Sequence, residues 1–239
     1  MERPRRNAAE GIVRELGLKI LSGDIAPGEQ LATEQALCER YAMSRTVIRE
    51  ALQALAAKGL TASRPRTGVI VLAPKRWNFL DADIIAWTEM LGERCRFFNE
   101  VMESRAILEP QIARLAAQRA DPDDLEAIEA ALVRMEEAAA RADIQDYNAA
   151  DLDFHMAMLE AARNVVLLRI GDLIRAALRT SFRLGTEGRE ISAESVRFHR
   201  SLFEAIRDGD GDAAAGHLER VASILVERLN ERAPRTAED

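Results

Sequence analysis

The most regular hydrophobic pattern in the first third of the chain lies in residues 44–59. Four apolar residues recur there at the i, i+3, i+4, i+7 spacing of an amphipathic helix, namely Ile48, Ala51, Leu52 and Leu55. Ser44 stands where the N-cap of this helix belongs. Residues 33–41 predict a shorter helix just before it, and only two residues connect the two segments. A helix, a tight turn and a second helix predict a helix-turn-helix.

Two short β-prone runs, residues 60–63 and 69–72, follow the second helix and flank a turn. Because that turn contains a proline and a glycine, its two arginines, Arg64 and Arg66, are expected to project from a hairpin. A helix-turn-helix followed by a basic hairpin is a winged helix. The alternative is a small structural subdomain whose positive charge is incidental.

The exposed start of the second helix would carry Arg45, Thr46 and Arg49 next to Ser44. An arginine guanidinium can bind guanine or a phosphate, and a threonine can contact a thymine methyl group or a phosphate. These are the groups that a recognition helix presents to a DNA major groove. We therefore expect this helix to contact double-stranded DNA.

From residue 81 onward the pattern is almost entirely helical, because the sequence is rich in alanine and poor in glycine. The expected helices cover residues 81–91, 94–119, 122–142, 144–162, 165–184, 191–208 and 212–232. The fold class is therefore mainly α, with the winged helix followed by an all-α antiparallel helical bundle. The expected organisation is a DNA-binding domain at 1–73, a linker and docking helix at 74–93, the helical domain at 94–233 and a disordered tail at 234–239.

The charge of the chain is divided unevenly between its two parts. The net charge is −7 over 239 residues, but residues 1–76 carry 13 Lys and Arg against 8 Asp and Glu, whereas residues 77–239 carry 20 against 32. A basic first part can bind the phosphate backbone while an acidic second part stays clear of it.

The two cysteines form no CxxC motif and predict neither a disulfide framework nor a thiolate metal site. Without a long apolar run or a signal-peptide-like start, we expect a soluble cytoplasmic protein with no membrane partner.

The three histidines of the chain fall in three different expected helices of the bundle. Asp151 and His155 are four residues apart, so they share one helix face, while His199 and His217 belong to two later helices. One carboxylate and three imidazoles would suit zinc, nickel, manganese or iron(II), with a coordination position left for another ligand. Asp153 is a rival carboxylate, but it lies two residues from His155 and points to another face. The spacing is equally compatible with three scattered histidines and no metal.

The first part of the chain resembles the winged-helix domain of the GntR family of bacterial transcription regulators. The resemblance covers residues 8–72 and is carried by three segments in order, SGDIAPGEQL, TEQALCERYAMSRTVIREALQALAAKGL and RPRTGVIV. It implies that Arg45, Thr46 and Arg49 read or clamp an operator, and that Gly68 lets the wing approach the minor groove. The family commonly carries an arginine where this chain has Gln35, so the DNA contact expected there is weaker or different.

The helical part resembles the FCD ligand-sensing domain of the FadR subfamily of GntR regulators. The segments that carry this resemblance are DLDFH, FHRSLFEAI and AGHL. In that domain the matching positions are metal ligands. The resemblance therefore implies a divalent ion, most simply zinc, bound by Asp151, His155, His199 and His217.

Four side chains are candidates for binding an effector. Arg105 can form either an i,i+4 surface pair with Glu109 or a bidentate contact with an effector carboxylate, and the resemblance favours the second. Arg179 and Arg183 are further candidates, for which a solvated helix face is the alternative. Asn164 is either a helix cap or a pocket residue.

Within the subfamily, residues 77–87 and 109–114 are most similar to the matching segments of sugar-acid-sensing regulators. This similarity implies a galactonate-like aldonate or a uronate as the effector. An ion with an open coordination position, together with an arginine, suits a hydroxy-carboxylate as a class.

These features together predict a ligand-responsive homodimeric repressor of sugar-acid catabolism, released from its operator when the effector binds at the metal. A two-fold dimer would place two recognition helices in successive major grooves of the operator. One alternative is the same class of regulator sensing a different small carboxylate. A second is a metal-dependent enzyme domain fused to a DNA-binding module, although no additional general base stands out. A third is an architectural DNA-binding protein in which the metal is purely structural.

Overall fold

The computed structural model describes residues 3–186 and 191–220, with side chains described except at 3–7, 181 and 183–186. The chain divides into two compact units, with the boundary between Phe98 and Asn99. Each unit has its own hydrophobic core. Within the described residues, no helix combines the length and the apolar character that a membrane crossing requires.

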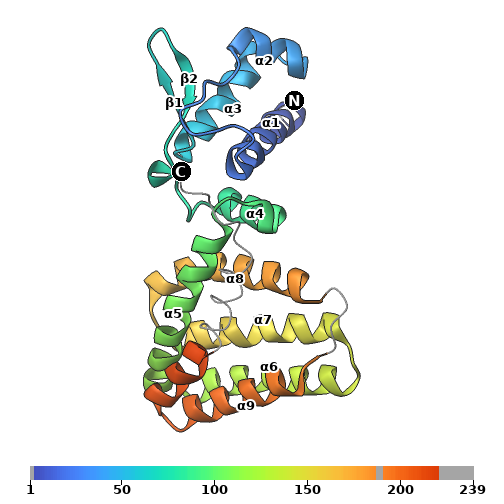
Figure 1. Cartoon of the computed structure of the whole chain (residues 1–239), viewed down its shortest axis with the longest axis vertical. Coiled ribbons are helices and arrows are strands. Elements are labelled where there is room, and N and C mark those ends of the chain that lie inside the picture. Colours follow the sequence, from blue (N-terminus) through green and yellow to red (C-terminus); the bar gives the residue numbers. More distant parts are fainter. Residues whose placement is uncertain (1–2, 187–190, 221–239) are drawn as a thin grey trace, which may run out of the picture. The chain divides into compact units, whose positions relative to one another are not determined.

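The first unit contains the winged helix (Figure 1). Its elements are α1 (Arg3–Ser22), α2 (Glu34–Tyr41), α3 (Arg45–Ala57), β1 (Thr61–Arg64), β2 (Gly68–Val71), the 3-10 turns η1 (Pro74–Arg76) and η2 (Gly92–Arg94), and α4 (Ala82–Leu91). Ser44 is the N-cap of α3, as predicted, because its hydroxyl accepts a hydrogen bond from Val47 N at 3.4 Å. The apolar face of α3 is buried, also as predicted, since Ile48, Ala51 and Leu55 have no exposed surface.

The wing is a two-stranded antiparallel hairpin that pairs Thr61 with Val71 and Arg64 with Gly68. Residues 28–31 bind the other side of β2 through backbone hydrogen bonds. Gly68 has a φ of +84°, and a Cβ at this position would lie 3.1 Å from the side-chain nitrogen of Gln30. The left-handed backbone at the start of β2 therefore favours glycine, and a larger residue would also have to displace the side chain of Gln30 slightly.

Residues 74–93, expected as a linker and docking helix, pack as part of the first unit. Trp77 and Trp87 from this segment are buried in its hydrophobic core. Gly17 of α1 makes room for Trp87, since a Cβ on Gly17 would lie 2.2 Å from the indole ring. Lys58, the C-cap of α3, forms an ion pair with Asp81 at the start of α4, with 2.9 Å between Nζ and Oδ1. Helices α3 and α4 thus belong to one packed body.

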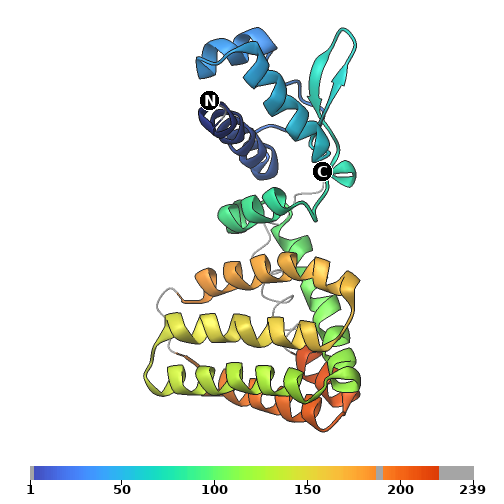
Figure 2. The same cartoon turned by 180° about the vertical axis from the view of Figure 1, so that it is seen from behind.

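The second unit is the all-α bundle that the sequence predicts. Its helices are α5 (Phe98–Arg119), α6 (Pro122–Ala140), α7 (Ile144–Ala161), α8 (Val165–Thr186) and α9 (Ala193–Arg207), and residues 211–220 are also helical. Helices α9, α6, α7 and α8 lie next to one another in this order, while α5 crosses them near one end (Figures 1 and 2). This arrangement brings side chains of α5, α7 and α9 together.

Candidate metal centre and DNA-binding face

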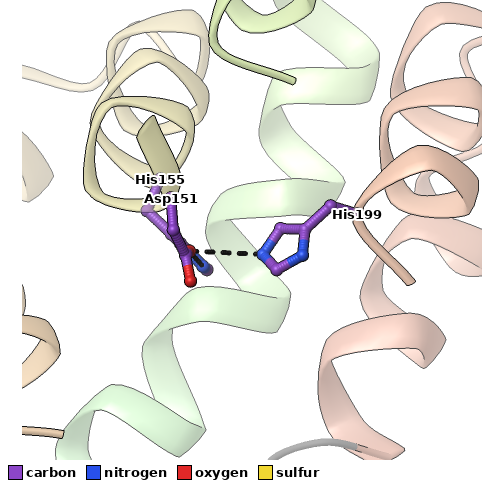
Figure 3. A group of neighbouring side chains, drawn as sticks. All are labelled: Asp151, His155 and His199. Carbon is purple, nitrogen blue, oxygen red and sulfur yellow. Dashed lines mark ion pairs between the residues drawn. The ribbon is translucent and has the colours of Figure 1, made fainter. Parts of the chain in front are cut away.

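Three of the four predicted metal ligands meet in the interior of the bundle (Figure 3). Asp151 and His155 come from adjacent turns of α7, and His199 comes from α9. The Oδ1 atom of Asp151 lies 3.3 Å from His155 Nε2 and 3.3 Å from His199 Nε2. All three side chains are buried, and their ligand atoms lie within 4.8 Å of one another. Helix packing therefore converts two sequence-distant segments into one donor set.

The donor atoms of this cluster fit a divalent ion. Asp151 Oδ1 and His199 Nε2 are buried and have no hydrogen-bond partner among the described residues, although burying such atoms unpaired is unfavourable. Ligand atoms held at about 2.1 Å from a tetrahedral ion are about 3.4 Å apart, close to the 3.3 Å between Asp151 Oδ1 and each histidine Nε2. A carboxylate oxygen and two imidazole nitrogens are also ordinary ligands of zinc.

Each histidine of the cluster has an outer partner on its other ring nitrogen. His199 Nδ1 lies 2.8 Å from the backbone oxygen of Ser195, so Nδ1 carries the proton and Nε2 is left as the ligand atom. His155 Nδ1 lies 3.2 Å from Glu109 Oε1, an ion-pair distance without hydrogen-bond alignment. The side chain of Ser195 accepts a hydrogen bond from the hydroxyl of Tyr147 at 2.8 Å, and burial raises the pKa of this tyrosine to about 12.

The buried charged groups of the cluster strongly shift one another's pKa values. Burial alone would lower the pKa of His155, but Glu109 and Asp151 overcome this and raise it to about 9. Burial would raise the pKa of Glu109, but Arg105 and His155 lower it to about 2. The pKa of Asp151 is likewise held well below its usual range by both histidines, against the effect of burial. Without an ion, His155 therefore carries the proton that balances these carboxylates.

The fourth predicted ligand, His217, lies outside the cluster in this structure. Its Nδ1 is 2.7 Å from Arg220 Nη2, and its ring packs against Phe198 at 6.3 Å between centroids. Its role as a ligand stays a prediction. Asp153, the rival carboxylate, is exposed and pairs with Arg134 at 2.6 Å, so it faces away from the cluster as expected.

The interpretation of Arg105 and Glu109 as a surface pair is wrong, although the pair itself exists. Arg105 Nε donates to Glu109 Oε2 at 2.9 Å, and both side chains are largely buried. The reason is that this face of α5 packs toward α7, where Glu109 meets His155. Sequence reasoning missed Glu109 as a site residue, because its i,i+4 spacing from Arg105 is equally that of an ordinary surface pair.

The other effector candidates differ in their surroundings. Asn164 caps α8, because its side-chain oxygen accepts hydrogen bonds from Val166 N and Leu167 N. Arg179 lies on an exposed face of α8. The side chain of Arg183 falls outside the described residues. Effector binding by these residues stays a prediction.

The predicted DNA-binding side chains of α3 share one exposed face. Ser44, Arg45, Thr46 and Arg49 are all exposed at or near the start of the helix. Arg49 is not free, however, because its Nε lies 2.9 Å from Glu34 Oε2 at the start of α2. Sequence reasoning missed this partner, since the two residues lie on different helices.

The wing and α2 carry the other predicted DNA-binding residues. Arg64 and Arg66 are exposed at the hairpin turn, and Arg66 adopts a left-handed backbone with a φ of +66°. Gln35 is also exposed, and its side-chain nitrogen donates to Glu39 at 3.2 Å. The arrangement presents a basic helix start and a basic hairpin on one unit, which suits a DNA duplex.

Two family models match the two parts of the chain. Residues 8–71 match the bacterial regulatory proteins of the gntR family, and residues 100–223 match the FCD domain. The first match covers the winged helix. The second covers the helices that carry the Asp151, His155 and His199 cluster.

Individual relatives agree with both matches. The Galactonate operon transcriptional repressor of Escherichia coli (strain K12) is 36% identical over 226 residues, which cover 94% of this chain and 98% of that protein. YieP, an uncharacterized HTH-type transcriptional regulator of the same strain, is 28% identical over 210 residues, which cover 88% of this chain and 90% of that protein. A solved structure of Lar, described as controlling expression of the Listeria monocytogenes agr system, is 20% identical with a TM-score of 0.60 and covers 94% of this chain and 97% of its own. The likeness to Lar bears on the fold alone.

Proposed function

Because the chain belongs to the GntR family of bacterial transcription regulators and carries an FCD domain, we propose that it is a homodimeric repressor of sugar-acid catabolism that a hydroxy-carboxylate releases from its operator. Both families consist of DNA-binding regulators rather than enzymes, so operator binding is the basic activity. The finer proposal adds an ion in the second unit and a sugar acid as the signal.

The observation that supports the sensing site is the convergence of Asp151, His155 and His199 with unpaired buried donor atoms. A divalent ion bound there would supply a Lewis-acid anchor for the hydroxyl and carboxylate oxygens of the effector. The protein shields this site from water, because Phe154 packs against His199 and both Phe154 and Tyr147 are buried. The name of the Escherichia coli relative favours an aldonate such as galactonate among possible effectors.

Effector binding is proposed to act by shifting a population of bundle arrangements. A ligand that binds one arrangement more tightly favours it, and dimers whose winged helices are misplaced for the operator dissociate. Coupling of this kind typically amounts to about 1–3 kcal/mol, or about 5–150-fold in operator affinity.

The test begins with a duplex that the purified protein selects from random-sequence DNA. Fluorescence anisotropy then measures operator affinity with galactonate, gluconate, glucuronate or lactate, with zinc present and after chelation. We expect a sugar acid to weaken operator binding about 5–150-fold only when the ion is present. Release by lactate and by none of the sugar acids would indicate that the effector is another small carboxylate. No release by any acid would contradict the sensing role.

Two substitutions on α7 make this test specific for the cluster. Asp151→Asn removes the carboxylate shared by both histidines and should abolish ion-dependent release. Asp153→Asn makes the same chemical change two residues away, on an exposed side chain paired with Arg134, and should leave release intact. Equal behaviour of the two variants would argue against the site.

A further inference from the structure

Glu109 on α5 is buried beside the metal cluster without being a member of it. Its two carboxylate oxygens face different partners. Oε2 accepts a hydrogen bond from Arg105 Nε at 2.9 Å, one turn earlier on α5. Oε1 lies 3.2 Å from His155 Nδ1 on α7, while Nε2 of the same ring faces Asp151. The carboxylate of Glu109 thus faces the ring nitrogen of His155 that would not bind the ion.

Burial makes this arrangement informative. Removing a carboxylate from water is unfavourable unless charged or hydrogen-bonding partners compensate. Arg105 compensates one oxygen, whereas Oε1 has no aligned hydrogen-bond donor among the described residues and faces the imidazole of His155. A packed apolar side chain at this position would avoid the cost of burying a carboxylate. The presence of the carboxylate therefore indicates a role that involves the imidazole of His155.

In His199, the second ring nitrogen faces a neutral backbone carbonyl in the way that the second ring nitrogen of His155 faces Glu109. Its Nδ1 lies 2.8 Å from the backbone oxygen of Ser195, and its Nε2 faces Asp151. Metal-bound histidines generally donate their second N–H to a carboxylate or a carbonyl, which selects the tautomer, orients the ring and raises the basicity of the ligand. A carboxylate raises that basicity further because it is charged.

We propose that Glu109 is the positioning residue of the metal site, holding His155 with a proton on Nδ1 and with Nε2 directed at the ion. In this scheme Arg105 holds Glu109 in place, so Arg105 acts on the effector through the metal site instead of binding it directly. The inference rests on the proposed function, because it requires that the cluster bind an ion.

The direct test replaces Glu109 with glutamine, which keeps the size and an acceptor oxygen but removes the charge. We expect the zinc dissociation constant of Glu109→Gln to rise about 10–100-fold, measured by competition with a chromogenic chelator. Glu109→Asp keeps the charge on a shorter side chain and should recover part of the affinity. Glu103→Gln, on the exposed face of the same helix, is the matched control and should bind zinc as the wild type does.

A spectroscopic measurement separates positioning from a general loss of structure. In zinc-loaded protein with isotope-labelled histidine, the NMR signal of His155 Nδ1–H should shift in Glu109→Gln, whereas that of His199 should not. If Glu109→Gln does not fold, the double variant Arg105→Gln/Glu109→Gln replaces the ion pair with an uncharged pair of similar size. The same loss of zinc affinity is expected of it.

The outcomes distinguish this inference from the proposed function. Wild-type zinc affinity in Glu109→Gln or in the double variant, together with lost affinity in Asp151→Asn, would overturn the inference and leave the metal site standing. A wild-type protein that binds no zinc, manganese or nickel would overturn both.

Discussion

Two arginine–glutamate pairs, one in each unit, have the same length and different surroundings. Arg49 Nε and Glu34 Oε2 lie 2.9 Å apart on side chains that are 62% and 38% exposed, whereas Arg105 Nε and Glu109 Oε2 lie 2.9 Å apart on side chains that are 12% and 7% exposed. An exposed pair contributes about 0–1 kcal/mol, but breaking a buried pair costs about 3–5 kcal/mol. Burial, and not distance, decides whether such a pair can be exchanged for another partner.

The difference suits the role proposed for each unit. Arg49 lies near the start of α3, the helix proposed to enter the DNA major groove, where a phosphate or guanine would replace Glu34 at little energetic cost. Separating Glu109 from Arg105 would leave an uncompensated charge buried in the bundle. Glu109 therefore stays in place as the partner of His155. The proposed DNA-binding face thus has a replaceable contact, and the proposed metal site has a fixed one.

The largest effect is expected when the buried pair is broken. Glu109→Ala leaves the charge of Arg105 without its buried carboxylate and should lower the free energy of unfolding by about 3 kcal/mol. Glu34→Ala should lower it by less than about 1 kcal/mol. Urea denaturation of the metal-free variants measures both values, and equal losses would contradict the comparison.

A change of pH should weaken the buried cluster alone. In the metal-free protein the two carboxylates raise the pKa of His155 to about 9, against about 6.5 in an unfolded chain. The stabilisation is therefore complete below about pH 6.5 and is lost as the pH rises toward 9, because the folded state holds the proton more tightly. Urea midpoints of the metal-free protein should fall over this range, whereas zinc affinity should rise because the ion displaces that proton. A metal-free midpoint that rises with pH would show that His155 is not the protonated group.

Removal of the exposed arginine should affect DNA binding and nothing in the bundle. Arg49→Ala should weaken operator binding by about 1–3 kcal/mol for each recognition helix, with zinc affinity unchanged. Arg200→Ala removes an arginine from an exposed pair with Glu136 in the second unit and serves as the control. Operator affinity measured by fluorescence anisotropy should be normal in this control, and unaltered binding by Arg49→Ala would overturn the assignment of the helix.

The smallest effect is expected from a substitution of Glu34, the ion-pair partner of Arg49. Glu34→Gln removes a negative charge from the DNA-binding face, so operator affinity should rise about 2–5-fold at low salt, and the gain should shrink as salt is added. Titrations at several salt concentrations measure this difference. Weaker binding would show instead that Glu34 holds Arg49 in its DNA-binding orientation.

The local sequence pattern was sufficient to predict each feature that depends only on near neighbours in the chain. The buried face of α3 and its cap at Ser44 follow from helical periodicity and from the hydrogen-bonding capacity of a serine side chain. The same periodicity places Asp151 and His155 on one face of α7 and turns Asp153 away from it. These positions need only the geometry of a single helix.

The sequence by itself thus determined the two-part organisation, the amphipathic helix α3 with its cap at Ser44, and the shared helix face of Asp151 and His155. Only the packing of helices decided that His199 joins Asp151 while His217 lies outside, and that Glu109 faces His155. Nothing local distinguishes the buried pair of Glu109 from an ordinary i,i+4 surface pair, because burial depends on which helix covers a face. A helix determines which side chains it presents together, and its neighbours determine what those side chains meet.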